Sequence, residues 1–126
     1  TPKVTDWPLY QSLLAIGLKA IFIPNTTTYY RQYDQNTAGL RRQFTKEQIK
    51  FGISVKINQY TKCLLWVSGE EKESVELELR KIEHLKKELD SEEAMKKYLR
   101  QVNKTAEEKI FYWWEYIDLK FLENKL

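Results

Sequence analysis

The sequence predicts a mainly α-helical chain that forms one domain over residues 1–126. Three observations predict this class. Only four glycines and three prolines occur in 126 residues, apolar residues recur at helical spacing along most of the chain, and capping residues precede several of these stretches. A chain of this length can bury a core without disulfides.

Residues 7–24 form the most apolar element, in which Lys19 is the only charged residue. A polar start that ends in Thr5-Asp6 can cap a helix here. The run of about seventeen apolar residues is near the lower limit for crossing a bilayer. It is therefore either a transmembrane helix or the buried helix of a soluble bundle, and we expect Leu13 and Ile16 to lie against apolar neighbours or lipid.

Residues 25–44 are expected to form a polar loop that contains three tyrosines beside Arg31. Aromatic rings interleaved with arginine can stack on nucleic-acid bases. Tyrosines with a buried ring and a wet hydroxyl are also common at protein interfaces and membrane borders. The interface interpretation is favoured over nucleic-acid binding.

Residues 45–68 are predicted as a second helix. Thr45 and Gln48 have the spacing of a capping box, and the isoleucines that follow recur at helical spacing. Alternating apolar residues from Phe51 to Ile57 also fit a strand, so a short β-hairpin over residues 51–67 is the alternative. Helix is preferred because Asn58-Gln59 is a poor hairpin turn, and Ser68-Gly69 is expected to end the element.

Residues 70–126 are predicted as charged amphipathic helices. One apolar stripe ends at Leu89, and Asp90 with Glu93 three residues later predicts a cap for a new helix. Thr105 with Glu108 predicts another start, for a last helix from Ala106 to about Glu123. The charges between the apolar positions are interpreted as a solvated helical surface.

The predicted last helix is aromatic on almost every side, through Phe111, Tyr112, Trp113 and Trp114. One packed core covers only one side of a helix. We therefore expect these rings to meet a partner or the bilayer interface, with at least one of Trp113 and Trp114 in such a contact. A core packed from several sides is the alternative.

The sequence contains no recognisable catalytic equipment. The single histidine, His84, has no second histidine or cysteine at ligand spacing, so no metal site is expected. The lone Cys63 is interpreted as a buried apolar residue. No glycine-rich phosphate loop is present, and the net charge of +3 is low for a dedicated DNA-binding module. We predict no catalytic residue, cofactor or small-molecule substrate.

Short motifs in the first third of the chain resemble a family. The segments are Pro2-Lys3-Val4-Thr5-Asp6, Leu9-Tyr10, Thr37-Ala38-Gly39-Leu40 and Arg42-Gln43. In this order they resemble a small two-helix accessory subunit of mitochondrial respiratory complex I. The family's second helix is strongly apolar, whereas residues 44–67 here include five charged residues.

The resemblance implies a non-catalytic structural subunit of the mitochondrial inner membrane, which scaffolds neighbouring protein subunits and faces lipid. It carries over no functional residues. The alternative is a soluble, intracellular helical-bundle interaction protein, which could touch nucleic acid through Arg31, Arg41 and Arg42.

Overall fold

The computed structural model describes residues 6–29, 43–109, 111, 114, 116 and 117. Within these residues the regular structure is entirely helical, which confirms the mainly α prediction. The helices are α1 (Asp6–Ala15), α2 (Lys46–Cys63), α3 (Gly69–Glu88) and α4 (Glu92–Glu108).

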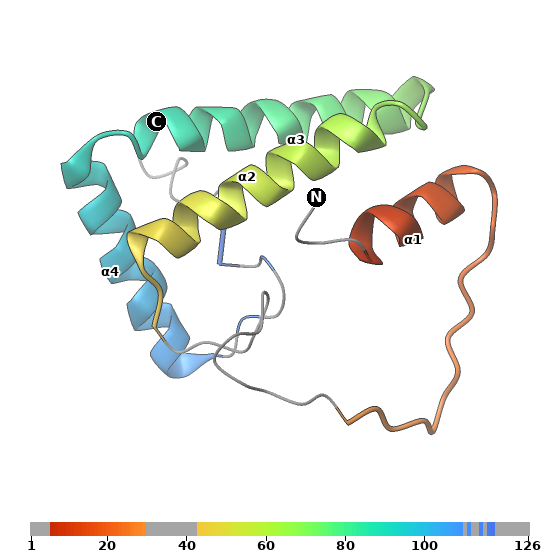
Figure 1. Cartoon of the computed structure of the whole chain (residues 1–126), viewed down its shortest axis with the longest axis horizontal. Coiled ribbons are helices and arrows are strands. Elements are labelled where there is room, and N and C mark those ends of the chain that lie inside the picture. The colour runs from red at the N-terminus through yellow and green to blue at the C-terminus, as the bar shows by residue number, and fades with distance from the viewer. Residues whose placement is uncertain (1–5, 30–42, 110, 112–113, 115, 118–126) are drawn as a thin grey trace.

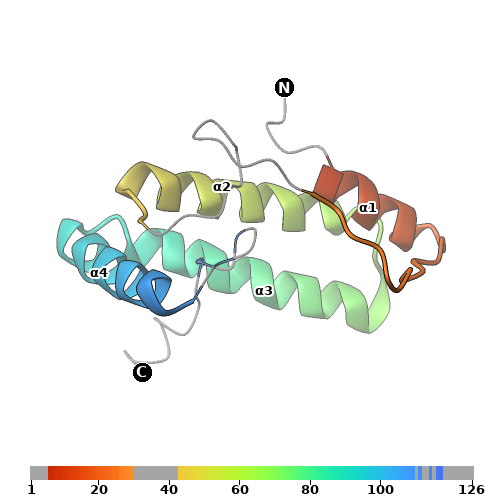
Figure 2. The same cartoon turned by 90° about the horizontal axis from the view of Figure 1, so that it is seen from below.

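Three of the helices meet at one end of the molecule. α2 and α3 run antiparallel, side by side, and α4 turns away from the end of α3 to cross the start of α2 (Figures 1 and 2). α1 lies at the other end, beside the last turns of α2. No described side chain of α1 belongs to the core cluster.

The predicted capping box starts α2. The Gln48 backbone N–H donates to Thr45 Oγ1 at 3.3 Å, and the Thr45 N–H donates to Gln48 Oε1 at 2.9 Å. Ile49 and Ile53 are buried four residues apart. The alternative hairpin at 51–67 is wrong, because helical spacing places these isoleucines on one buried face, where strand alternation would divide the apolar residues of this stretch between two faces. The helix ends at Cys63, five residues before the predicted Ser68.

The break between α3 and α4 occurs where the sequence predicts it, with the cap one residue later. Ser91 rather than Asp90 caps α4, and its Oγ accepts from the Ala94 N–H at 3.5 Å. The stripe of α3 packs into the core through Ile82, Leu85 and Leu89. α4 contributes four buried residues: Met95, Tyr98, Val102 and Ala106.

The predicted helix from Ala106 to about Glu123 is corrected by the structure as far as Ile117, and its remainder lies outside the described residues. Ala106 is buried within α4, and Lys109, with φ −139° and ψ 154°, ends that helix in extended backbone. The described residues beyond it are not helical. These residues are Phe111, Trp114, Tyr116 and Ile117, and all four are buried in the core. A continuous helix would point these side chains in several directions, whereas the irregular backbone lets all four be buried.

Side-chain hydrogen bonds join α4 to the residue before the capping box of α2 and to the segment that follows α4. Asn103 binds the backbone of Phe44 on both sides: its Oδ1 accepts from the Phe44 N–H at 2.7 Å, and its Nδ2 donates to the Phe44 carbonyl at 3.2 Å. The Tyr98 hydroxyl donates to the carbonyl of Tyr116 at 2.9 Å in a buried position. These bonds satisfy backbone groups that have no helical partner.

α1 is shorter than the predicted element over residues 7–24. Gly17 has a φ of +93°, and it ends the helix in a Schellman motif: the Gly17 N–H donates to the Leu14 carbonyl at 3.0 Å, and the Leu18 N–H to the Leu13 carbonyl at 3.1 Å. Glycine adopts this left-handed conformation without the penalty that other residues incur. Among the described helices, none is both long enough and apolar enough to cross a membrane.

Candidate functional site

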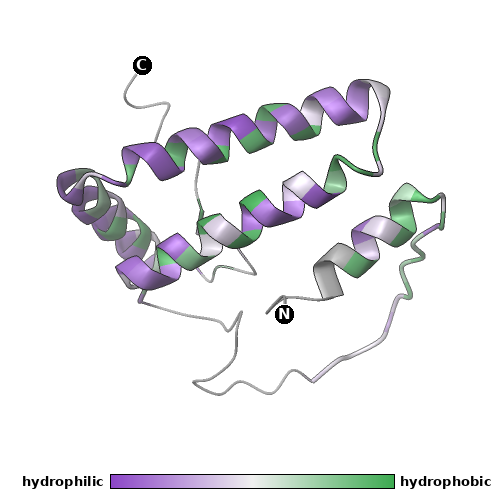
Figure 3. Ribbon diagram, turned by 45° about the horizontal axis from the view of Figure 1, so that its top comes forward, coloured by the Kyte–Doolittle hydropathy of each residue, from purple (hydrophilic) through white to green (hydrophobic). Residues whose placement is uncertain are grey.

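Most of the exposed large apolar side chains of the described chain lie in one segment, residues 9–23, which we call the apolar arm. Phe22 is 87% exposed and Ile16 is 62% exposed. Eight large apolar side chains of the arm are more than half exposed: Leu9, Tyr10, Leu14, Ile16, Leu18, Ile21, Phe22 and Ile23. Figure 3 shows this hydrophobic stretch following α1. Contiguous exposure on this scale is typical of a surface that binds a partner.

The local sequence explains why the arm stays exposed. Its apolar residues surround α1 rather than forming one stripe, so contact with α2 can bury only one side. Leu13 becomes half-buried there, while its neighbour Leu14 is exposed. Beyond the Schellman motif the backbone is no longer helical, and residues 18–23 are all exposed.

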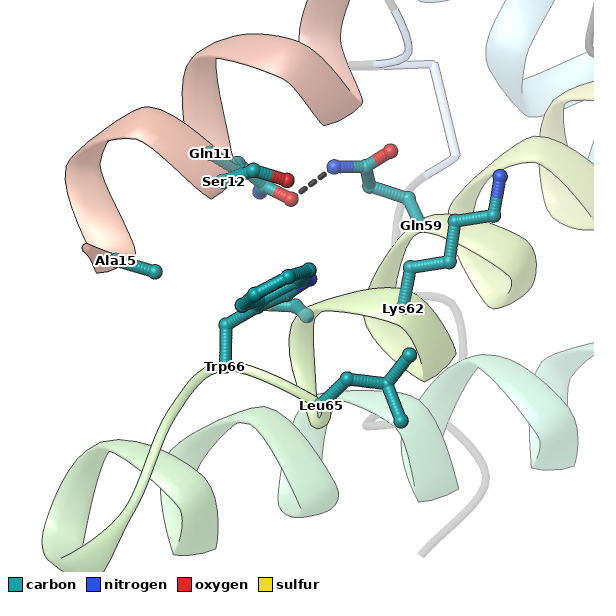
Figure 4. A pocket seen from close by; sticks show the side chains of 8 residues that line it. Gln11, Ser12, Ala15, Gln59, Lys62, Leu65 and Trp66 are labelled. Atoms are coloured by element: carbon teal, nitrogen blue, oxygen red, sulfur yellow. Dashed lines mark hydrogen bonds between the residues drawn. The ribbon is translucent and has the colours of Figure 1, made fainter.

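A pocket of about 270 Å³ separates α1 from the end of α2 (Figure 4). Gln59 closes one side. It is only 3% exposed, and its Nε2 donates a hydrogen bond to Gln11 Oε1. The walls are mainly apolar, and they are lined by Gln11, Ser12, Ala15, Gln59, Lys62, Cys63, Leu65 and Trp66.

Leu65 and Trp66 extend the exposed surface beyond the arm. Trp66 lies at the pocket and is 53% exposed, and Leu65 beside it is more exposed still. Neither residue was predicted from the sequence to belong to a site. The available signal was an apolar run that continues past the end of the helical stripe, just before Ser68-Gly69.

The electrostatics of the pocket are simple. Lys62 is the only charged residue in its lining. Burial, followed by the nearby Glu71 carboxylate, raises the pKa of the Cys63 thiol, so the protonated form dominates at neutral pH. Burial also raises the pKa of Tyr60. A half-buried, protonated thiol is a poor nucleophile, and the pocket is suited to binding apolar groups.

The residues predicted to form an interface divide between two regions. Leu13 and Ile16 belong to the arm, half-buried and exposed respectively. Phe111 and Trp114 were predicted to lie at a partner or membrane interface, but both are buried core residues. Trp114 is 2% exposed and packs edge-on against Phe51, with ring centroids 5.6 Å apart. Tyr112 and Trp113 lie outside the described residues.

In the part of the chain that the structure describes, no three histidine, cysteine, aspartate or glutamate side chains gather closely enough to hold a metal ion. His84 is an exposed side chain on α3. The chain has no match among protein-family models, curated proteins or solved structures.

Proposed function

We propose that this chain is a non-catalytic accessory subunit that attaches to a larger protein assembly through its apolar arm. The observation that carries the proposal is the exposure of that arm beside a core that is complete without it. No residue of 9–29 belongs to the core cluster, which is built from residues 44–117. The arm is thus available for an interaction that the fold does not itself require.

The magnitudes support a protein-sized contact. Fully burying one leucine, isoleucine or phenylalanine side chain is worth about 1.5–3 kcal/mol, and association costs about 4–15 kcal/mol in lost freedom. One or two exposed residues could offset only the lowest part of that range. The eight large side chains of the arm offset it if most of them become buried.

Trp66 and the pocket give the contact a centre. Tryptophan is enriched among the residues that dominate binding energy once a partner desolvates them, and Trp66 is half-exposed beside the pocket. A partner that covers the arm and Trp66 would also desolvate the pocket between Gln59 and Ala15. The surrounding apolar residues would then exclude water from this centre.

The proposed host is the membrane arm of mitochondrial respiratory complex I, at the inner membrane. The support for this host is the motif resemblance in the first third of the chain. The partners would be neighbouring protein subunits and lipid, and the role would be scaffolding rather than electron transfer. The alternative host is a different assembly that receives the same arm.

The test measures whether the chain co-migrates with complex I. Mitochondrial membranes that contain a tagged copy are dissolved in mild detergent, separated on a native gel and stained for NADH dehydrogenase activity. We expect the tag to migrate with the active complex. The triple variant Leu18→Ser, Ile21→Ser, Phe22→Ser should lose this co-migration, because it removes exposed apolar area and leaves the core intact.

Leu77→Ser is the matched control, since Leu77 is an exposed apolar residue on α3, outside the arm. It should migrate as the unaltered chain does. Co-migration that survives the triple variant would refute the arm as the contact. A tag that never migrates with complex I but enters another assembly through the arm would refute the proposed host alone.

A further inference from the structure

The outer side of α4 is a basic face, formed by Lys96, Lys97, Arg100 and Lys104. All four side chains are exposed, and no acidic residue lies between Ala94 and Ala106. The buried residues of α4 occupy the opposite side of the helix, so these cations point away from the core. None of them forms an ion pair with any residue of the described ranges.

The start of α3 is an acidic face, formed by Glu70, Glu71 and Glu73. These side chains are exposed, and Lys72 is the only cation among them. The next acids along the helix already have partners: Glu76 pairs with Arg80 at 3.9 Å, and Glu78 pairs with Lys81 at 2.8 Å. The three carboxylates of the acidic face form no ion pair with any residue of the described ranges, so they are accessible to an external partner.

The two faces lie at opposite ends of the molecule. The acidic face is on the first turn of α3, whereas α4 begins beyond the last turn of α3 (Figures 1 and 2). A helix of 20 residues is about 30 Å long. The basic and acidic faces of one chain therefore cannot touch each other.

We propose that a second copy of this chain binds head to tail, with the basic face of one copy against the acidic face of the next. Complementary surfaces at opposite ends of a molecule form a heterologous contact, which leaves one free face at each end of the pair. The contact includes neither the apolar arm nor a residue of the pocket lining, although Glu71 lies near Cys63 of that lining. It does not rest on the proposed function.

The chemistry sets the character of this contact. Exposed ion pairs are weak individually and are screened by salt. Three carboxylates and four cations on helical surfaces can form several such pairs at once. Association should therefore be weak, dependent on concentration and strongly sensitive to ionic strength.

The experiment is sedimentation velocity of the full chain over a concentration series. In about 10 mM NaCl, where the Debye length is about 30 Å, we expect the average sedimentation coefficient to rise with concentration. In about 1 M NaCl, where it is about 3 Å, we expect monomer. Monomer at every concentration in both salts would overturn the proposal.

Charge reversal tests the two faces separately. The basic-face variant Lys97→Glu, Arg100→Glu and the acidic-face variant Glu70→Lys, Glu73→Lys should each remain monomeric in low salt. An equal mixture of the two should associate again, because the intact acidic face of the first variant can bind the intact basic face of the second. Misfolding of either variant could not produce this recovery.

The matched control is Glu83→Lys, Asp90→Lys, which reverses two exposed acids outside both faces. It should associate as the unaltered chain does. Association that persists in high salt or in both double variants would assign the contact to another surface. A monomeric chain that instead sediments with phosphatidylglycerol vesicles through the basic face would make a lipid surface the occupant and refute the second copy.

Discussion

The apolar arm and α4 are opposites in composition and in burial. The arm, residues 9–23, contains one charged residue, yet eight of its large apolar side chains are exposed. α4 has four acidic and four basic residues among 17, yet it supplies four core residues. The placement of apolar residues, rather than their number, decides which segment is buried. One neighbouring surface can cover a single apolar stripe, but it cannot cover apolar residues that surround a helix on all sides.

The largest effect should come from the core side of this comparison. Trp114→Ala removes a buried ring that packs against Phe51 and Tyr116, and we expect the free energy of unfolding to fall by about 3–5 kcal/mol. Phe22→Ala removes an exposed ring of the arm and should change it by less than about 0.5 kcal/mol. Urea unfolding followed by circular dichroism measures both. A comparable loss from Phe22→Ala would show that the arm is part of the fold.

Gly52→Ala should have an intermediate effect. A Cβ at Gly52 would lie 2.7 Å from the Tyr116 hydroxyl oxygen and 3.1 Å from Ile117 Cδ1. Overpacking costs about 1–3 kcal/mol, and the better helix propensity of alanine returns about 1 kcal/mol. We therefore expect a net loss of roughly 1 kcal/mol, measured by thermal unfolding. Gly17→Ala on the arm side meets no neighbour, and its strain is confined to the positive φ.

The smallest effect should be the pH dependence from two exposed carboxylates at helix starts. Backbone and Thr45 hydrogen bonds lower the pKa of Glu47, and the hydrogen bond and charge of Lys46 lower the pKa of Glu92. A lowered folded-state pKa adds stability that is present above the ordinary value of 4.5 and is lost as the pH falls through the lowered pKa.

We expect a slight decrease in the free energy of unfolding as the pH falls through and below 4.5. The double variant Glu47→Gln, Glu92→Gln should flatten this decrease, as followed by urea unfolding over a pH series. The arm contributes nothing to it, because residues 9–23 contain no acid. An unchanged slope in the double variant would assign the dependence to other carboxylates.

Local patterns were enough to predict what local interactions determine. The capping box of Thr45 and Gln48 and the stripe that ends at Leu89 involve residues a few positions apart. The end of α1 was also locally encoded, since Gly17 interrupts the apolar run, but helical spacing on both sides of it favoured one continuous helix.

The aromatic segment after α4 could not be predicted in the same way. Its rings are ordered by Phe44 and Phe51, about sixty residues earlier: Phe44 meets Phe111 with centroids 5.8 Å apart, and Phe51 meets Trp114. Spacing along the chain contains no information about such distant partners. Phe111 and Trp114, which the sequence predicted at an exposed surface, are buried, whereas apolar residues of the arm and Trp66 are exposed.

The bonds between Asn103 and the Phe44 backbone have a kinetic consequence. They join residues 59 positions apart, so they close a long loop whose entropy must be lost before either bond can form. The α3–α4 corner involves neighbours in sequence and can form earlier. Interactions made after the rate-limiting step slow unfolding without accelerating folding. If the Asn103 bonds form after that step, we expect Asn103→Ala to accelerate unfolding more than it slows folding.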